Sequence, residues 1–161
     1  RRGIDICCLQ ETRWKSNGVC HVNSDKEKYK LFWNGQKKAK NGVGIFVREP
    51  LAQEVLDIKR INSRLMWVKL RLEKQTMIIF SAYAPQTGES EEIKNDFWAA
   101  FSDIISTIPK SETILIGGDL NGHVGEKTDD IDNVHGGFGY GERNKDGNRI
   151  LEFAESHGFV Y

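Results

Sequence analysis

The sequence predicts a mixed α/β sandwich formed by a single domain. Its first half contains short apolar segments separated by turn residues, as in antiparallel hairpins. Its second half contains two segments in which apolar residues recur every three or four positions, as in amphipathic helices. The order is therefore strands, helix, strand, helix, which favours a mixed sandwich over a strictly alternating parallel sheet. The 161 residues are enough for one independently folding domain.

The early strands are predicted from apolar runs that stop at polar or turn residues. The first run, residues 4–9, ends abruptly at Gln10, as a buried strand does when it delivers polar side chains at its C-terminal end. Two later segments alternate in polarity, and Lys74-Gln75 would form the hairpin between them. The predicted early strands are residues 4–9, 29–33, 42–47, 65–72 and 76–82.

The period changes after residue 85. Residues 89–108 form one amphipathic helix, with three glutamates at its start that complement the helix dipole and Pro109 at its end. A fully apolar strand at 113–116 follows, and then a glycine- and aspartate-rich loop from Gly122 to Gly147. The second helix ends at His157 with Gly158 as its cap. Residues 159–161 are predicted to start another strand.

Composition excludes several classes of protein. Apolar residues make up 39% of the chain, charged residues 29%, and the mean hydropathy is −0.51, which excludes membrane-embedded, collagen-like and disordered chains. The net charge is zero, yet residues 1–80 carry +9 and residues 81–161 carry −9. Either the two sets pair within the fold, or a basic face that includes Lys37, Lys38 and Lys40 meets a polyanion while acidic residues hold a metal.

The three cysteines do not form a disulfide framework. Cys7 and Cys8 are adjacent, and neighbours on a strand point to opposite faces. We interpret all three, with Cys20, as reduced core residues. A metal site built with His21 is the alternative, but the spacing of paired zinc ligands is missing.

Two carboxylates follow directly after apolar strands. Glu11 comes after the first run, and Asp119 comes after Gly117-Gly118. If the two strands are neighbours, these carboxylates converge on one sheet edge, where Mg²⁺ could bind one or two carboxylates and keep waters for a phosphate to displace. Asn121 lies two residues beyond Asp119 and can face the same ligand, while Pro85 holds Tyr83 near the same edge.

Four segments together resemble the endonuclease/exonuclease/phosphatase family, with a DNase I-like fold. They are similar in particular to the apurinic-type endonuclease domains of retrotransposons that lack long terminal repeats. The segments are Leu9-Gln10-Glu11-Thr12-Arg13-Trp14, Asn41-Gly42-Val43-Gly44-Ile45-Phe46-Val47, Tyr83-Ala84-Pro85-Gln86 and Gly117-Gly118-Asp119-Leu120-Asn121.

The resemblance implies a role for each matching residue in metal-assisted hydrolysis of a phosphodiester. Glu11 would bind Mg²⁺, with Mn²⁺ as the alternative, and Arg13 would clamp the scissile phosphate. Tyr83 would hydrogen-bond a phosphate oxygen. Asp119 would orient or deprotonate the attacking water, and Asn121 would stabilise the charge that builds on the phosphoryl oxygens.

The resemblance extends to the loop before the second helix. The segment 141–149 matches the retrotransposon group, and Arg143 and Asn144 would contact the DNA backbone or, alternatively, cap the helix. His123 lies near Asp119 and would touch a phosphate or belong to a surface loop. His157 is a residue of the helix end and matches no catalytic histidine.

The resemblance also implies that parts of the family pattern are missing. No asparagine precedes Glu11, and the later aspartate and Ser-Asp-His segment do not occur, so residues 1–161 are interpreted as a partial domain, truncated at both ends, with weak or no activity. The leading hypothesis is a DNA endonuclease, intracellular and nuclear, with no membrane contact. A binding module for nucleic acid or protein with the same fold is the alternative, and a phosphatase of inositol lipids or a sphingomyelinase is the third.

Overall fold

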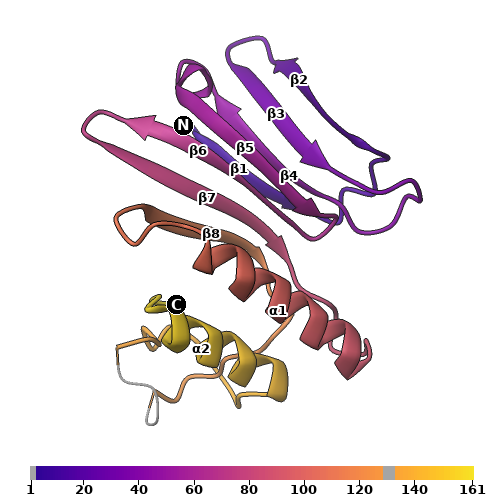
Figure 1. Cartoon of the computed structure of the whole chain (residues 1–161), viewed down its shortest axis with the longest axis vertical. Helices are drawn as coiled ribbons and strands as arrows, with labels where there is room; N and C mark the ends of the chain where they lie inside the picture. Colours follow the sequence, from indigo (N-terminus) through magenta and orange to yellow (C-terminus); the bar gives the residue numbers. More distant parts are fainter. Residues whose placement is uncertain (1–2, 129–132) are drawn as a thin grey trace. The chain divides into compact units, whose positions relative to one another are not determined.

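The computed structural model describes residues 3–128 and 133–161, and the chain divides into two compact units. Unit 1 comprises Arg1–Tyr83 and Pro109–Asp119 and contains all of the strands (Figure 1). Unit 2 comprises Ala84–Ile108 and Leu120–Tyr161 and contains both α-helices. None of the helices in the described residues is long and apolar enough to span a membrane.

Unit 1 is a sandwich of two four-stranded sheets. Neighbouring strands of the first sheet are all antiparallel, and in the second sheet only the last pair is parallel. The first sheet has the order β1 (Ile6–Gln10), β4 (Val43–Arg48), β3 (Lys28–Asn34) and β2 (Asn17–Asn23). The second has the order β5 (Val55–Asn62), β6 (Leu65–Leu72), β7 (Gln75–Tyr83) and β8 (Thr113–Asp119), and a short 3₁₀ helix, η1 (Leu51–Glu54), precedes β5.

The core of unit 1 lies between the two sheets. Inward-facing side chains of β3 and β4 pack against alternate side chains of β6 and β7, because successive residues of a strand point to opposite faces. The largest contributors are Phe32, Ile45, Met66, Val68 and Ile79, all with at most 2% of their surface exposed. The opposite face of β6 and β7 is also buried, which explains why these strands read as nearly continuous apolar runs.

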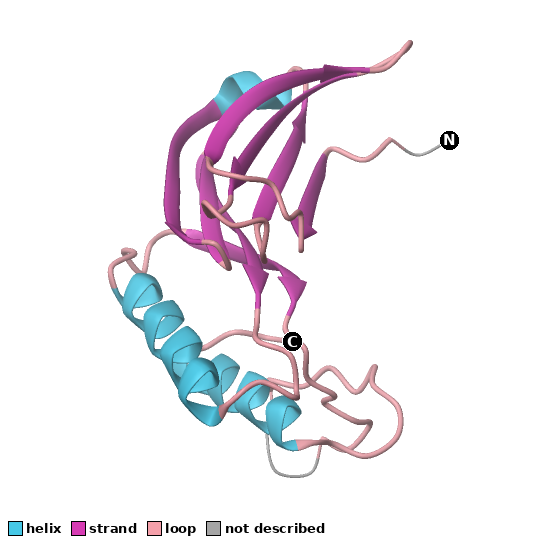
Figure 2. Ribbon diagram, turned by 90° about the vertical axis from the view of Figure 1, so that its right-hand side faces the viewer, coloured by secondary structure: helices cyan, strands magenta, loops and turns pink. Residues whose placement is uncertain are grey.

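Unit 2 packs two helices against each other. The helix α1 (Glu91–Ser106) begins at Ser90, whose hydroxyl accepts the Ile93 N–H, and α2 (Lys145–His157) ends at Gly158 in the left-handed conformation. Figure 2 shows the two helices, in cyan, side by side. Trp98 and Phe101 of α1 meet Phe153 of α2 with ring centroids 5.1 and 4.7 Å apart. Aromatic packing therefore joins the helices.

The sandwich and both helices were predicted correctly, while several details differ. The edge strands β2 and β5 were missed, and the turn between β6 and β7 is at Glu73 and Lys74 rather than Lys74-Gln75. Residues 159–161 do not form a strand, although the Tyr161 N–H donates to the carbonyl of Val134. Cys20 is exposed on β2, so the prediction that it belongs to the core is wrong.

Candidate active site

The end of β1 packs against β7 and β8 within unit 1. The hydroxyl of Ser81 on β7 donates to the Leu9 carbonyl at 2.9 Å and accepts a bond from the Gln10 amide at 3.1 Å. On β8, a Cβ at Gly117 would lie 2.9 Å from the sulfur of Cys8, so only glycine permits this close approach. The last residues of β1 are thereby fixed against the ends of two strands of the other sheet.

Tyr83 and Asp119 are paired residues at the ends of β7 and β8. These strands are parallel and in register from Met77 and Thr113 onward, so Tyr83 and Asp119 lie side by side. Both are two residues beyond Ser81 and Gly117, and they therefore point to the face that packs against β1. The strand β1 ends at Gln10, so this pair lies at the end of the sandwich where Glu11 begins the next loop.

The loop after β1 carries an exposed ion pair. The Arg13 guanidinium donates a short hydrogen bond to Oε1 of Glu11. This hydrogen bond and the charge of Glu11 raise the pKa of Arg13, with a smaller contribution from Tyr83. Glu11 directly follows β1, and the end of β1 packs against the ends of β7 and β8. Glu11 and its partner Arg13 therefore lie at the same end of unit 1 as Tyr83 and Asp119.

The backbone of this loop has an unusual conformation. Glu11 and Arg13 have φ angles of 51° and 55°, in the left-handed region that non-glycine residues seldom adopt. The segment directly before β4 holds the loop in this shape, because the N–H groups of Thr12 and Arg13 donate to the carbonyls of Gly42 and Asn41. Gly42 itself has φ 99°, and a side chain there would collide with the Thr12 hydroxyl. The Asn-Gly pair before β4 thus shapes the loop that presents Glu11.

Arg64 contacts Tyr83 and was not predicted from the sequence. Its guanidinium carbon lies 5.0 Å from the centre of the Tyr83 ring, and Nη1 donates to the Tyr83 carbonyl at 3.1 Å. The Tyr83 N–H in turn donates to the Arg64 carbonyl. Arg64 stands in the turn between β5 and β6, and its position next to the alternating strand 65–72 was the only available signal. The cation stabilises the position of the Tyr83 ring.

Asn121 lies in unit 2 and has a constrained conformation. Its φ is 50°, which Asn tolerates better than most residues. Nδ2 donates to the Ala84 carbonyl at 2.8 Å, and the Asn121 carbonyl accepts the Thr87 hydroxyl at 3.3 Å. One of its two amide N–H bonds is thus committed to the segment 84–87, which fixes the orientation of the side chain.

A buried ion pair stabilises the segment to which Asn121 is bound. Nζ of Lys94 on α1 lies 3.0 Å from Oδ1 of Asp146 in the first turn of α2, and only 6% and 9% of these side chains are exposed. The same ammonium donates to the Thr87 carbonyl at 2.8 Å. Lys94 therefore links both helices of unit 2 to the backbone that contacts Asn121.

Arg143 and Asn144 make structural hydrogen bonds within unit 2. Nε and Nη2 of Arg143 donate to the carbonyls of Val124 and Lys127 at 2.9 and 2.5 Å. Asn144 is the N-cap of α2, and its Oδ1 accepts the N–H groups of Gly147 and His123. The capping alternative thus describes Asn144 in this structure, while contact of either residue with DNA stays a prediction.

The other polar candidates have defined surroundings. His157 is the last residue of α2, which agrees with its interpretation as a helix-end residue. Its Nε2 lies 3.0 Å from the hydroxyl of Ser102 on α1. Burial raises the pKa of the Cys8 thiol to about 11, with a smaller contribution from Cys7, so Cys8 stays protonated at neutral pH. Cys7, Cys20 and His21 belong to no metal-binding group among the described residues.

The residues at the end of unit 1 fit a hydrated Mg²⁺ ion. Glu11 and Asp119 are both exposed, and Mg²⁺ commonly takes one or two carboxylates and keeps several waters. Within residues 3–128 and 133–161, no three His, Cys, Asp or Glu side chains are grouped to enclose a metal. The donor set is therefore suited to a partly hydrated, hard cation that a phosphate can reach.

Solved structures share the fold at low sequence identity. An AP endonuclease, LMAP, from Leishmania major has a TM-score of 0.58 and 12% identity over 95% of this chain and 57% of its own. The endonuclease domain of TRAS1, a telomere-specific non-LTR retrotransposon, has a TM-score of 0.55 and 14% identity, over 96% of this chain and 58% of its own. The DNase I-like fold class is confirmed by these likenesses.

Sequence comparison gives the family. Craniofacial development protein 2 of Bos taurus is 27% identical over 99% of this chain and 26% of its own length, so the chain spans about a quarter of that relative. The transposon TX1 uncharacterized 149 kDa protein of Xenopus laevis is 28% identical over 74% of this chain and 9% of its own length. The model of the endonuclease/exonuclease/phosphatase family matches residues 1–147. The chain therefore belongs to the endonuclease/exonuclease/phosphatase family.

Proposed function

We propose that this chain forms the phosphodiester-hydrolysing site of a Mg²⁺-dependent DNA endonuclease that nicks its substrate. The observation that supports this proposal is the gathering of Glu11, Arg13, Tyr83 and Asp119 at one end of unit 1. These residues come from three separate segments of the chain, and together they provide two carboxylates, one cation and one phenol. That set suits a metal ion, a phosphate and an attacking water.

Glu11 would bind the cation, and Mn²⁺ could replace Mg²⁺. The bound cation would polarise the phosphate and stabilise the leaving oxygen. Arg13 is free to turn from Glu11 to the scissile phosphate when the carboxylate takes the metal, because both side chains are exposed, at 66% and 43%. The ion pair thus keeps both groups in place until substrate and metal arrive.

Asp119 would orient the attacking water and accept its proton. As the water oxygen bonds to phosphorus, the bond between phosphorus and the leaving oxygen breaks. The Tyr83 hydroxyl would donate to a phosphate oxygen, and Asn121 would stabilise the charge that develops on the phosphoryl oxygens. Arg143 and Asn144 would contact the DNA backbone. A DNA substrate implies a nuclear location.

A binding module with the same fold is the second candidate function. The specific observation in its favour is that Glu11 is paired with Arg13 and that the described residues contain no metal cage of three or more ligands. In that case DNA or a protein would be bound without hydrolysis. The basic residues Lys37, Lys38 and Lys40 are exposed in either case and would contact the DNA backbone.

Nicking of supercoiled plasmid in the presence of Mg²⁺ separates the two candidates. We expect the wild-type chain, as a partial domain with weak activity, to convert plasmid slowly to the open circular form. Glu11→Gln and Asp119→Asn should each lower this rate by about 10²-fold or more, as loss of a transition-state contact or an acid/base group does. Chelation of the metal should abolish the activity.

The matched controls carry the same chemical changes elsewhere. Glu152→Gln and Asp103→Asn alter exposed acidic residues of the two helices and should leave the rate unchanged. Nicking that survives both Glu11→Gln and Asp119→Asn would remove the proposed site. A wild-type chain that binds DNA with a salt-dependent affinity and never cleaves it would instead be the binding module.

A further inference from the structure

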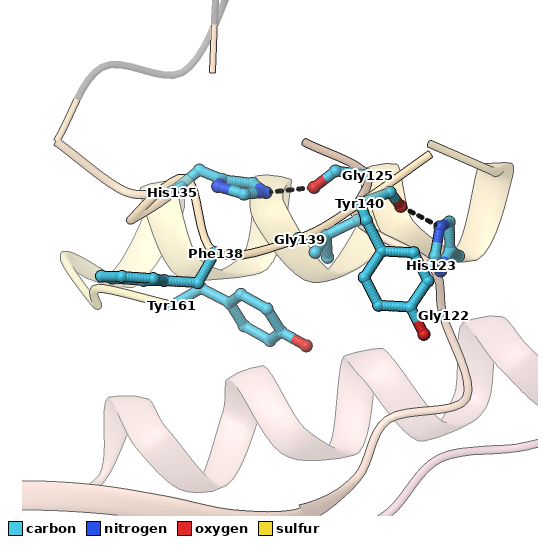
Figure 3. Close-up of a pocket in the computed structure, with 9 residues that line it drawn as sticks. Gly122, His123, Gly125, His135, Phe138, Gly139, Tyr140 and Tyr161 are labelled. Carbon is cyan, nitrogen blue, oxygen red and sulfur yellow. Dashed lines mark hydrogen bonds between the residues drawn. The ribbon is translucent and has the colours of Figure 1, made fainter. Parts of the chain in front are cut away.

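A second candidate ligand site lies in unit 2, on the loop between β8 and α2. It is a pocket of about 260 Å³ whose lining comes entirely from residues of unit 2 (Figure 3). Apart from His123, whose predicted alternatives are a phosphate contact and a surface loop, the roles assigned above use none of its side chains, which include Phe138, Tyr140, Tyr161 and two histidines. The pocket is smaller than the roughly 300–1,000 Å³ of sites for drug-sized ligands, so it suits a single flat ring system.

Aromatic rings form much of the pocket, and they are exposed to an unusual degree. Phe138 has 95% of its surface exposed, Tyr140 has 78% and Tyr161 has 51%. Phe138 and Tyr140 stand on either side of Gly139, within the sequence Gly-Gly-Phe-Gly-Tyr-Gly. Glycines on both sides of each ring let the backbone adapt while it presents the rings to solvent. A lone exposed aromatic residue is ordinary, but three around one pocket indicate a ligand with a flat apolar face.

One histidine holds the loop and the other offers a polar contact. His135 is buried, its Nδ1 accepts the Gly137 N–H at 2.8 Å, and its Nε2 therefore donates to the Gly125 carbonyl at 2.9 Å. Nε2 of His123 lies 2.6 Å from the Tyr140 carbonyl, which can only accept, so Nε2 carries the hydrogen. This leaves Nδ1 of the exposed His123 as a hydrogen-bond acceptor. Figure 3 shows the contacts of His135 with Gly125 and of His123 with Tyr140 as dashed lines.

The charge of the described lining favours an uncharged ligand over a phosphate or a metal. Among residues 3–128 and 133–161, no lysine, arginine, aspartate or glutamate side chain lines the pocket, so these residues offer neither the cations that a phosphate needs nor the carboxylates that a hard metal needs. The described lining instead suits a ligand that is uncharged, flat and able to donate a hydrogen bond to an imidazole nitrogen. A nucleobase with an N–H group at its edge meets all of these requirements.

We propose that this pocket binds one unpaired nucleobase of a DNA strand. The base stacks on the rings of Phe138 and Tyr140 and donates a hydrogen bond to Nδ1 of His123. This inference rests on the proposed function, because it takes its ligand from the DNA on which the endonuclease would act. Stacking on aromatic rings tolerates every base, so the site would add affinity with little sequence preference.

Binding to single-stranded DNA with and without bases tests the proposal. The probes are a fluorescently labelled oligothymidylate and an oligonucleotide of equal length in which every residue is abasic, both measured by anisotropy in EDTA to prevent cleavage. Because stacking of one base is worth about 1–3 kcal/mol, we expect wild-type protein to bind the abasic probe about 5- to 150-fold more weakly. Phe138→Ala combined with Tyr140→Ala should weaken binding of oligothymidylate by a similar factor and leave binding of the abasic probe unchanged.

A control variant and two contrary results complete the test. Ile93→Ala removes another exposed apolar side chain of unit 2, outside the pocket, and should change neither affinity. The proposal is overturned if wild type binds both probes equally or binds neither. It is also overturned if the double variant loses affinity for both probes alike, since the rings would then serve the fold or the backbone. Circular dichroism of the double variant should be unchanged because both rings are exposed.

Failure of this proposal and failure of the proposed function give different results. Glu11→Gln should lower plasmid nicking by about 10²-fold or more, whereas the ratio of the affinities for the two probes in EDTA should stay that of the wild type. Base-dependent binding by a wild-type chain that never nicks would reject hydrolysis alone. Nicking that requires Glu11, together with equal affinity for the two probes, would reject the nucleobase pocket alone.

Discussion

Each of the two units contains an ion pair, and the two pairs differ in burial. Glu11 and Arg13 in unit 1 are only two residues apart and exposed, with 43% and 66% of their side chains accessible. Lys94 and Asp146 in unit 2 are 52 residues apart and almost fully buried. An exposed pair can open when a better partner arrives, whereas a buried pair cannot lose one member without leaving an unpaired charge. Under the proposed function, the exposed pair would serve binding, whereas the buried pair links the two helices of unit 2.

The hydrogen bonds of the two pairs agree with this difference. Lys94 also donates to the backbone at Thr87, so its ammonium has a second buried partner that fixes its position. Arg13 donates to Glu11 from a loop whose backbone is held in the left-handed region. Strained backbone of this kind costs free energy and is found mainly at functional sites. The comparison therefore predicts large losses of stability from the buried pair and losses of binding from the exposed pair.

The largest expected effect comes from breaking the buried pair. Lys94→Met keeps the length of the side chain and leaves the Asp146 carboxylate buried without its cation, which should cost about 3–5 kcal/mol of unfolding free energy in a denaturant titration. Removing both charges, in Lys94→Met with Asp146→Leu, should recover most of this loss. Lys110→Met removes an exposed lysine and should be neutral. A small loss in Lys94→Met would show that the pair does not organise unit 2.

Asn144 offers an intermediate effect. Its side-chain oxygen caps α2 and also accepts the His123 N–H, so Asn144→Ala should lower the unfolding free energy by about 1 kcal/mol, within the 0.5–2 kcal/mol range of N-cap substitutions.

Asn144→Asp distinguishes the cap from a DNA contact. Aspartate is an equally good N-cap, so the thermal midpoint should stay close to that of the wild type. Its negative charge would repel a phosphate, and the affinity for DNA should therefore fall if Asn144 contacts the backbone as predicted. Unchanged affinity together with unchanged stability would leave Asn144 only its capping role.

The exposed pair should have the smallest effect on stability. Arg13→Ala is expected to leave the thermal midpoint unchanged, because exposed ion pairs contribute little. If Arg13 clamps a phosphate, the same substitution should weaken DNA binding and reduce the slope of log affinity against log salt concentration by about one. Lys59→Ala provides a cationic control in β5 of the same unit. An unchanged salt slope in Arg13→Ala would place Arg13 outside the DNA interface.

The parts of the fold that the sequence predicts best are those with strong patterns. The alternation in β6 and β7 and the three-and-four spacing of α1 mark buried faces directly. The strands β2 and β5 lie at sheet edges, where much of each strand is exposed and no apolar periodicity is required. Residues 159–161 resemble a strand because they are apolar, yet two hydrogen bonds with residues 134–136 hold Tyr161 outside any sheet.

The candidate site is only partly visible in the sequence. The positions of Glu11 and Asp119 after apolar strands predict that they reach a sheet edge, but β1 and β8 belong to different sheets that pack together. The left-handed backbone of Glu11 and Arg13 has no local signal, because it is imposed by Asn41 and Gly42. Likewise, nothing in the sequence around Arg143 predicts that its guanidinium donates to the backbone carbonyls of Val124 and Lys127.

The parallel pairing of β7 with β8 governs when the site can assemble. Tyr83 and Asp119 become neighbours only after 35 intervening residues, which include α1, have been made and have crossed back to the sheet. Antiparallel hairpins such as β6 with β7 close short loops and form first, while this crossover pays a larger loop-closure entropy. On a translating ribosome, a chain that has just completed β7 can already pair most of its strands and still lacks the second carboxylate.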